Sequence, residues 1–170
     1  MPPITASVFE LFSIGPGPSS SHTMGPMRAG RDFLLRCREL TLAERRRAAR
    51  IEARLFGSLA ATGRGHGTDR ALLAGLLGHA PESCPPGLLA GLDPAAEHAA
   101  PLSLREDGPR LPIRPGDIVF DTLDHRHPHS NTLVLRLLDR AGKPICGRTY
   151  YSVCGGSITF KRQRTRETPE

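Results

Sequence analysis

Residues 7–26 read SVFELFSIGPGPSSSHTMGP, and they place a loop stiffened by glycine and proline directly before a helix. Pro26 fixes where the helix can start, because proline is tolerated only in the first turn, where backbone N–H groups have no intrahelical partner. Thr23 is therefore the expected N-cap. The three hydroxyls and the imidazole of residues 19–22 then lie at the positive end of the helix dipole, where a carboxylate or phosphate would bind.

Hydrophobic periodicity predicts two helices with a strand between them. Residues 23–39 carry apolar side chains at helical spacing, and residues 51–57 show the alternation of a strand with one buried face. A glycine-rich loop follows, after which Thr68 and Asp69 cap a second helix that ends at Gly78. The apolar face of the first helix needs a sheet to cover.

The second half of the chain favours β-structure. Residues 117–122, 132–138 and 144–153 are predicted strands, and a turn at residues 139–143 joins the last two as a hairpin. Residues 80–114 hold many prolines, and we expect at most a short helix there. Locally paired strands after early helices indicate an α+β fold, with a mixed or antiparallel sheet packed by helices.

The length of 170 residues suits one domain. We expect that domain over residues 1–156, and a charged tail over residues 157–170 that is disordered or a truncated linker. Neither a membrane-spanning apolar run nor a secretory signal is visible, so we expect a cytoplasmic protein without a membrane partner. Reduced thiols are expected at the four cysteines, which form no CxxC pair: Cys37, Cys84, Cys146 and Cys154.

The formal net charge of +6 comes almost entirely from arginine, since Lys143 and Lys161 are the only lysines. Residues 45–47 and 161–166 are basic runs, but neither interleaved aromatic residues nor a zinc or helix-turn-helix spacing accompanies them. We therefore expect solvated charge and no nucleic-acid partner. The shortage of lysine also argues against a pyridoxal-phosphate enzyme, which needs a Schiff-base lysine.

Two histidines provide the first candidate catalytic groups. His22 and His66 occupy matching positions, each in a glycine-containing loop just before a predicted helix cap. Two such loops could face one anionic ligand. A Ser/His hydrolase is a weaker interpretation, because no Gly-x-Ser-x-Gly elbow is present and Ser21 directly precedes His22. The glycines at 63–67 also lack the spacing of a dinucleotide fingerprint.

His129, with Asn131, is the third candidate. His125, His127 and His129 alternate, and imidazoles two residues apart on a strand can share a metal ion. Pro128 interrupts that pattern and no carboxylate or thiol ligand is assigned to it, so we expect no metal site. His125 and His127 are expected at the surface.

The motifs resemble a known family. Taken in order, they are similar to the bacterial iron–sulfur L-serine dehydratases, specifically to the N-terminal β domain, called the β subunit where the enzyme is split into two chains. The matching segments are residues 7–26, LFGSLAATGRGHGTDRA at 55–71, HSNT at 129–132 and RTYYSV at 148–153. The resemblance runs from about residue 7 to residue 156.

This resemblance implies a fold similar to the allosteric substrate-binding domain of D-3-phosphoglycerate dehydrogenase. It implies an L-serine ammonia-lyase that yields pyruvate and ammonia, with a [4Fe–4S] cluster whose free iron is a Lewis acid for the departing hydroxyl. In the family the cluster cysteines belong to a separate α domain or subunit. We therefore expect this chain to bind no cluster alone, to be inactive alone and to pair with an α domain, with a homodimer as a further possibility.

The family's motifs also imply roles for residues of this chain, without deciding which imidazole is the base. A stand-alone regulatory module that binds a small acid without catalysis is the alternative, and it predicts the same anion pocket. Cys154 stands where the family has glycine, and we expect it to be buried. The expected catalytic residues are His22, His66 and His129, and the expected L-serine-binding residues are Ser19, Ser20, Ser21, Thr23, Thr68, Asp69 and Asn131.

Overall fold

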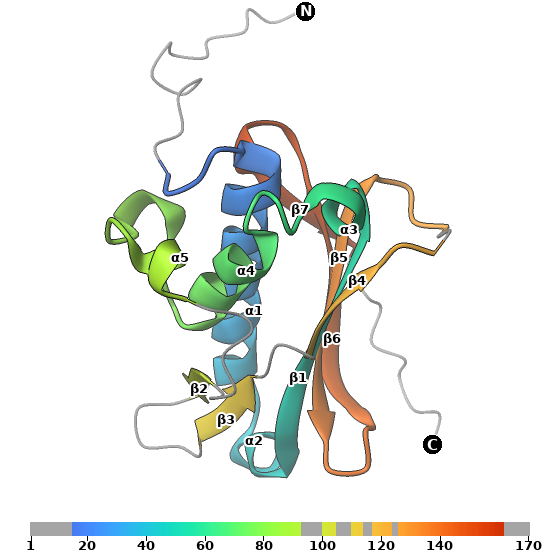
Figure 1. The fold of residues 1–170 in the computed structure, drawn as a ribbon. Helices are drawn as coiled ribbons and strands as arrows, with labels where there is room; N and C mark the ends of the chain where they lie inside the picture. The colour runs from blue at the N-terminus through green and yellow to red at the C-terminus, as the bar shows by residue number, and fades with distance from the viewer. Residues whose placement is uncertain (1–14, 93–99, 105–109, 114–116, 124–125, 162–170) are drawn as a thin grey trace, which may run out of the picture.

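A computed structural model of the chain describes residues 15–92, 100–104, 110–113, 117–123 and 126–161 (Figure 1). The first part of the opening stretch, His125 and the end of the expected tail lie outside these residues. The elements in chain order are η2 (Ser20–Met24), α1 (Gly25–Glu39), α2 (Leu42–Arg47), β1 (Ala48–Gly57), α3 (Ser58–Thr62), α4 (Thr68–Leu76), η3 (Pro81–Ser83), α5 (Leu88–Gly91), β2 (Ala100–Ser103), β3 (Arg110–Ile113), β4 (Ile118–Asp121), β5 (Asn131–Asp139), β6 (Pro144–Ser152), η5 (Cys154–Gly156) and β7 (Ile158–Lys161).

A five-stranded sheet in the order β4-β1-β5-β6-β7 forms one layer. β1 and β4 are parallel, whereas the β1–β5, β5–β6 and β6–β7 pairs are antiparallel. Figure 1 shows α1, α4 and α5 on the same side of this sheet. The expected α+β fold with a mixed sheet packed by helices is therefore confirmed.

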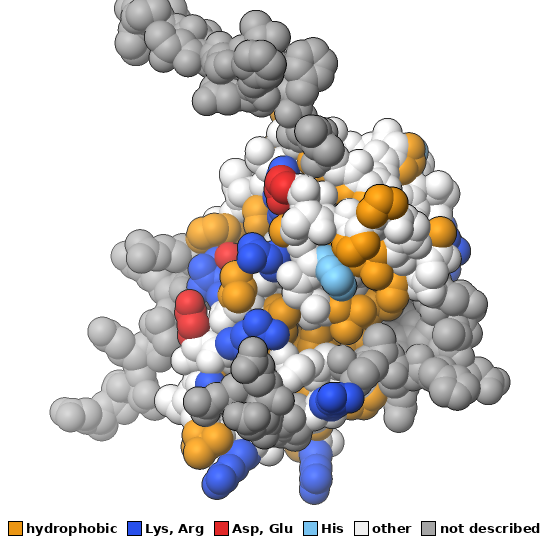
Figure 2. Space-filling model, turned by 90° about the vertical axis from the view of Figure 1, so that its left-hand side faces the viewer, with side chains coloured by type: hydrophobic (Ala, Val, Ile, Leu, Met, Phe, Trp, Pro, Cys, Tyr) orange, Lys and Arg blue, Asp and Glu red, His pale blue; other side chains and the backbone are white. Residues whose placement is uncertain are grey.

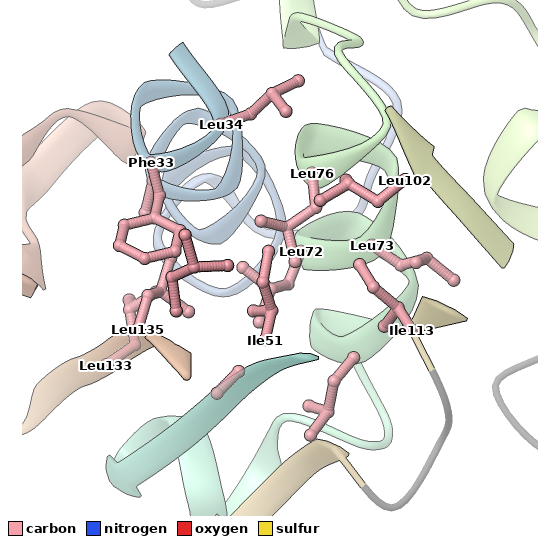
Figure 3. Close-up of a cluster of buried hydrophobic side chains, with 14 of the residues drawn as sticks. Phe33, Leu34, Ile51, Leu72, Leu73, Leu76, Leu102, Ile113, Leu133 and Leu135 are labelled. Carbon is pink, nitrogen blue, oxygen red and sulfur yellow. The ribbon is translucent and has the colours of Figure 1, made fainter. Parts of the chain in front are cut away.

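The core lies between the helices and the covered face of the sheet. In Figure 3, side chains of α1 and α4 point toward those of β1 and β5. Each fully buried side chain of this kind contributes about 1.5–3 kcal/mol through the area removed from water. The labelled members of the cluster are Phe33, Leu34, Ile51, Leu72, Leu73, Leu76, Leu102, Ile113, Leu133 and Leu135.

Two glycines allow α1 and α4 to approach each other closely. A Cβ atom at Gly30 would lie 2.6 Å from the carbonyl oxygen of Leu72, and one at Gly75 would lie 2.0 Å from the carbonyl oxygen of Met27. Neither position has room for a side chain between the two backbones. The close crossing brings the N-terminal ends of the two helices together, where the candidate site lies.

The predicted N-cap at Thr23 is wrong, because the chain starts to wind earlier. Residues 20–24 form a π-helical turn ahead of α1, and Ser19 is its N-cap, with Oγ accepting a hydrogen bond from the N–H of His22 at 3.3 Å. Pro26 does lie in the first turn of α1, as predicted.

The small sheet of β2 and β3, the strand β7 and the exposure of Cys154 differ from the sequence predictions. β2 and β3 pair as a small antiparallel sheet in which Pro101 lies opposite Pro112, and proline in both strands hides their pattern. β7 pairs with β6, so the sheet continues past residue 156, where we expected the domain to end. Cys154 is exposed in η5 rather than buried, because it lies in a turn beyond the end of β6.

The helical side of the molecule is shown in Figure 2, where Lys and Arg side chains are scattered among apolar ones and do not form a continuous stripe on that face. None of the helices in the described part of the chain combines the length and the apolar character needed to cross a membrane.

Candidate active site

His22 and His66 lie next to each other at the N-terminal ends of two helices. His22 belongs to the turn that leads into α1, and His66 to the loop between α3 and α4. Their ring centroids are 5.0 Å apart and their planes are tilted by 54°. The structure thus joins two candidates from separate motifs, as the sequence predicts.

Reciprocal hydrogen bonds hold the two histidine segments together. The Thr23 hydroxyl donates to the carbonyl oxygen of His66 at 3.2 Å, and the Thr68 hydroxyl donates to the carbonyl oxygen of His22 at 2.6 Å. Both threonines are fully buried. In this structure, therefore, the two hydroxyls bind backbone carbonyl groups and are not open to a ligand. Both threonines were expected to contact substrate.

We expect Thr23→Val and Thr68→Val each to lower the free energy of unfolding by about 1–2 kcal/mol, since each leaves a buried carbonyl without its donor while keeping the volume. The double variant should lose less than the sum, because the two bonds hold the same pair of segments. Urea unfolding of the four proteins measures this coupling. Additive losses would show that the two bonds act independently.

Serine hydroxyls contact both ring nitrogens of His22. Its Nδ1 lies 3.0 Å from Oγ of Ser21, and its Nε2 lies 3.0 Å from Oγ of Ser58. A neutral imidazole has one donor and one acceptor nitrogen, so one serine accepts from the ring and the other donates to it. Ser58 was not among the expected site residues. The signal was present in the sequence, as a small polar residue directly after Gly57 at the end of a predicted strand.

The environment of His22 favours its neutral form. Burial lowers the pKa of His22 below its usual 6.5, and the nearby His66 lowers it further by repulsion, while an interaction with the backbone of Ser58 acts in the opposite direction. A neutral imidazole at physiological pH can accept a proton. The site therefore contains a group with the properties of a general base.

His129 packs differently from the other two histidines. Its Nδ1 accepts the N–H of Asn131 at 3.0 Å, and its ring lies 6.2 Å from that of Tyr151. Tyr151 follows the buried Tyr150 on β6, so its side chain is on the opposite face of the sheet from the helices. The loop still adjoins the site through its backbone, since the Ser130 carbonyl accepts the N–H of Ser58 at 2.9 Å.

Asn131 lies at the first position of β5, paired with Gly57, on the same face as the buried Leu133. Its Oδ1 is buried, and among the described residues no partner donates to it. A buried acceptor without a donor is costly, and a bound ligand with an N–H or O–H group would relieve that cost.

The remaining expected site residues lie in the turn that carries His22 and in the first turn of α4. Ser19 caps the turn, Ser20 is exposed, and the carbonyl of Ser21 accepts the Ser152 hydroxyl at 2.6 Å. Asp69 is buried in the first turn of α4, where it accepts the N–H of Arg70 at 2.9 Å.

Comparison with known proteins identifies the family of this chain. The family model described as "Serine dehydratase beta chain" matches residues 7–163. The chain belongs to this family. It is 40% identical over 160 residues to an L-serine dehydratase of Streptomyces coelicolor, 39% over 169 residues to one of Mycobacterium tuberculosis and 35% over 161 residues to one of Haemophilus influenzae. These matches cover 89%, 94% and 89% of this chain but 33%, 34% and 33% of the relatives, so the chain spans about a third of their length.

The four thiols of this chain do not converge as a ligand set for an iron–sulfur cluster. Cys37 and Cys146 are close to each other but lie at the α1–β6 contact, and Cys84 and Cys154 belong to separate turns. Within the described residues, no three His, Cys, Asp or Glu side chains converge as metal ligands. An iron–sulfur cluster is held by several cysteine thiolates that converge on it, and the cysteines of this chain are not arranged in that way.

We expect an NMR titration to place the pKa of His22 below 6.5, and the His66→Gln variant to raise it, since His66 is the second cause of the shift. The same titration of the variant His79→Gln, at a histidine beyond the end of α4, provides the control. An unchanged His22 pKa in His66→Gln would contradict the assigned repulsion.

The lowered pKa also predicts how stability depends on pH. The unfolded chain holds the His22 proton more tightly than the folded chain, so this contribution to stability is present above about pH 6.5 and is lost as pH falls through the folded pKa. Urea unfolding at pH 7.5 and 5.5 should therefore show a larger loss of stability for wild type than for His22→Gln. An equal loss in the two proteins would contradict this linkage.

Proposed function

We propose that this chain is the β part of an L-serine dehydratase, and that His22 is the base that removes the α-proton of L-serine. The observation that supports this most directly is the position of the His22 imidazole, held between two serine hydroxyls beside His66. The family and the relatives named L-serine dehydratase support the substrate. The product is an enamine that becomes pyruvate and ammonia.

In this proposal the chain's own groups bind serine and accept its proton. The buried Oδ1 of Asn131 accepts a hydrogen bond from the substrate ammonium. The substrate displaces the serine hydroxyl that donates to the His22 ring, and the unprotonated nitrogen freed in this way takes the α-proton, while the hydroxyl that accepts from the other nitrogen keeps the ring in orientation. His66 and His129 are the further expected catalytic residues, and Ser19 and Ser20 contribute hydroxyls on the substrate side.

The departing hydroxyl needs an acid, and this proposal assigns that role to no described residue of this chain. We propose that an α domain or subunit, corresponding to the two thirds of the relatives outside the match, brings the [4Fe–4S] cluster to the face that carries His22. The intact enzyme is then an assembly of the two parts.

A chimera tests the proposed function. The matched third of the Streptomyces coelicolor relative is replaced by this chain, and anaerobic pyruvate formation from L-serine is measured. We expect activity in the chimera and none in this chain alone. If the chimera folds and is inactive, while the isolated chain binds serine or another small acid in calorimetry, the regulatory alternative is the correct interpretation.

A further inference from the structure

Two thiols meet where α1 packs on β6, far along α1 from the candidate site. Cys37 lies in the last turns of α1, and Cys146 lies near the start of β6. Their Sγ atoms are 3.9 Å apart, although the residues are separated by 109 positions in sequence. Contact between two cysteines from distant segments gives them a chemistry that neither has alone.

The surrounding contacts fix the geometry of this pair. Alternate residues of β6 face α1: Tyr150 donates its hydroxyl to Asp32 at 2.6 Å, and Arg148 lies 3.4 Å from the same carboxylate. Cys146 is the next residue in this row, paired with the fully buried Leu137 of β5. The two sulfurs need to approach by about 2 Å to reach the bonding distance of a disulfide, a movement within reach of side-chain rotation.

The two thiols differ in access and in acidity. Cys37 is fully buried and Cys146 is partly buried. The contact with Cys37 is the first cause that lowers the pKa of the Cys146 thiol, whereas the same contact and burial raise the pKa of Cys37. Cys146 is therefore the thiol that an oxidant meets first, and Cys37 is the second thiol, with its Sγ 3.9 Å away.

We propose that Cys37 and Cys146 are a redox-active dithiol that closes to an intramolecular disulfide. With a glutathione-type disulfide as oxidant, the Cys146 thiolate attacks one of its sulfurs and expels a glutathione thiolate, giving a mixed disulfide. Cys37 then loses its proton and attacks Sγ of Cys146, expelling the second glutathione thiolate. The two cysteines lose two electrons and two protons, and one glutathione disulfide becomes two glutathione thiols.

Formation of the disulfide would link α1 covalently to the sheet, at the end of α1 opposite His22. The closed loop is long, so the bond removes much conformational freedom from the unfolded chain. We expect the oxidised protein to melt about 5–15 °C higher than the reduced protein. The dithiol therefore couples the redox state of the surroundings to the stability of this fold.

The experiment treats the full chain with glutathione disulfide, followed by non-reducing peptide mapping and a thermal melt. We expect a linked Cys37–Cys146 peptide, loss of two of the four thiols and a higher Tm that dithiothreitol reverses. The double variant Cys84→Ser/Cys154→Ser removes the other two thiols and should behave as wild type. Cys146→Ser should abolish both the link and the shift in Tm.

Three outcomes would overturn the proposal. They are a stable glutathione adduct on Cys146 without closure, linkage that involves Cys84 or Cys154 in place of this pair, and closure that lowers Tm. Cys37→Ala gives a second test that does not depend on Cys146→Ser folding, because its remaining Cys146 should stop at the mixed disulfide.

Discussion

If the proposed function holds, replacing His22 by alanine should lower the kcat of the chimera by about 10²-fold or more, which is the usual contribution of a positioned general base. Burial and His66 lower the pKa of the imidazole, which favours its neutral form, and two serine hydroxyls contact its ring nitrogens. A base acts mainly in the transition state, so kcat and kcat/KM should fall together. Steady-state pyruvate formation by the chimera described above measures both constants.

Companion variants separate the base from the groups around it. Ser58→Ala removes one contact to the ring and should lower kcat less than His22→Ala does. His79→Ala, beyond the end of α4, should leave kcat and KM unchanged. A His22→Ala enzyme that keeps its kcat and shows only a raised KM would assign His22 to substrate orientation, and the same assay of His66→Ala and His129→Ala would then identify the base.

The pH profile gives a second readout of the same assignment. If His22 is the base, kcat/KM should fall on the acid side with an apparent pKa below 6.5, because only the neutral imidazole accepts a proton. His66→Gln should move that limb to higher pH. If His22 had only a structural role, the acid limb of the kcat/KM profile would lie at the same pH in wild type and in His66→Gln.

The sequence predicts a strand correctly where apolar and polar residues alternate. Ile51, Ala53 and Leu55 alternate, and all three are buried in β1, so the strand and its inner face follow from the sequence. In β2 and β3 the paired prolines lack the N–H groups that a strand ladder uses, so no local sequence rule predicts that pair of strands. β7 is short, follows two glycines and is defined by pairing with β6 rather than by its own pattern.

The candidate site was harder to predict than the helices that carry it. Glycines and hydroxyls around His22 and His66 indicated one shared ligand, and the rings do lie together. The exchange of hydrogen bonds by Thr23 and Thr68 joins segments more than forty residues apart and depends on how the helices cross. From the sequence alone, such threonines are read as helix caps or ligand contacts. Their actual partners are backbone atoms of a loop distant in sequence, which no local pattern indicates.

Gly75→Ala should produce the largest loss of stability among single methyl additions to the helices. Alanine favours a helix by about 1 kcal/mol over glycine, so propensity alone predicts a gain. The added Cβ would lie 2.0 Å from the carbonyl oxygen and 2.8 Å from the carbonyl carbon of Met27, and 3.0 Å from the amide nitrogen of Arg31. Backbone atoms cannot rotate away, so α1 and α4 must separate.

We expect overpacking to outweigh propensity and to lower the free energy of unfolding by about 3 kcal/mol, or Tm by about 6–12 °C. Gly91→Ala is the matched control, since Gly91 lies in α5 and a Cβ there would meet nothing within 4 Å among the described residues. Thermal and urea unfolding measure both variants. Equal stability of Gly75→Ala and wild type would show that the two helices are less tightly packed than the structure has them.

The same substitution tests whether the helix crossing positions the site. α1 continues from the turn that carries His22, and α4 begins at Thr68, whose hydroxyl holds the His22 carbonyl. Separating the helices should weaken that bond and move the two rings apart from their 5.0 Å contact. The repulsion from His66 would then decrease, and the pKa of His22 should rise toward 6.5 in a folded Gly75→Ala protein, as an NMR titration would show. An unchanged pKa would mean that the two loops keep their positions without the close contact of the helices behind them.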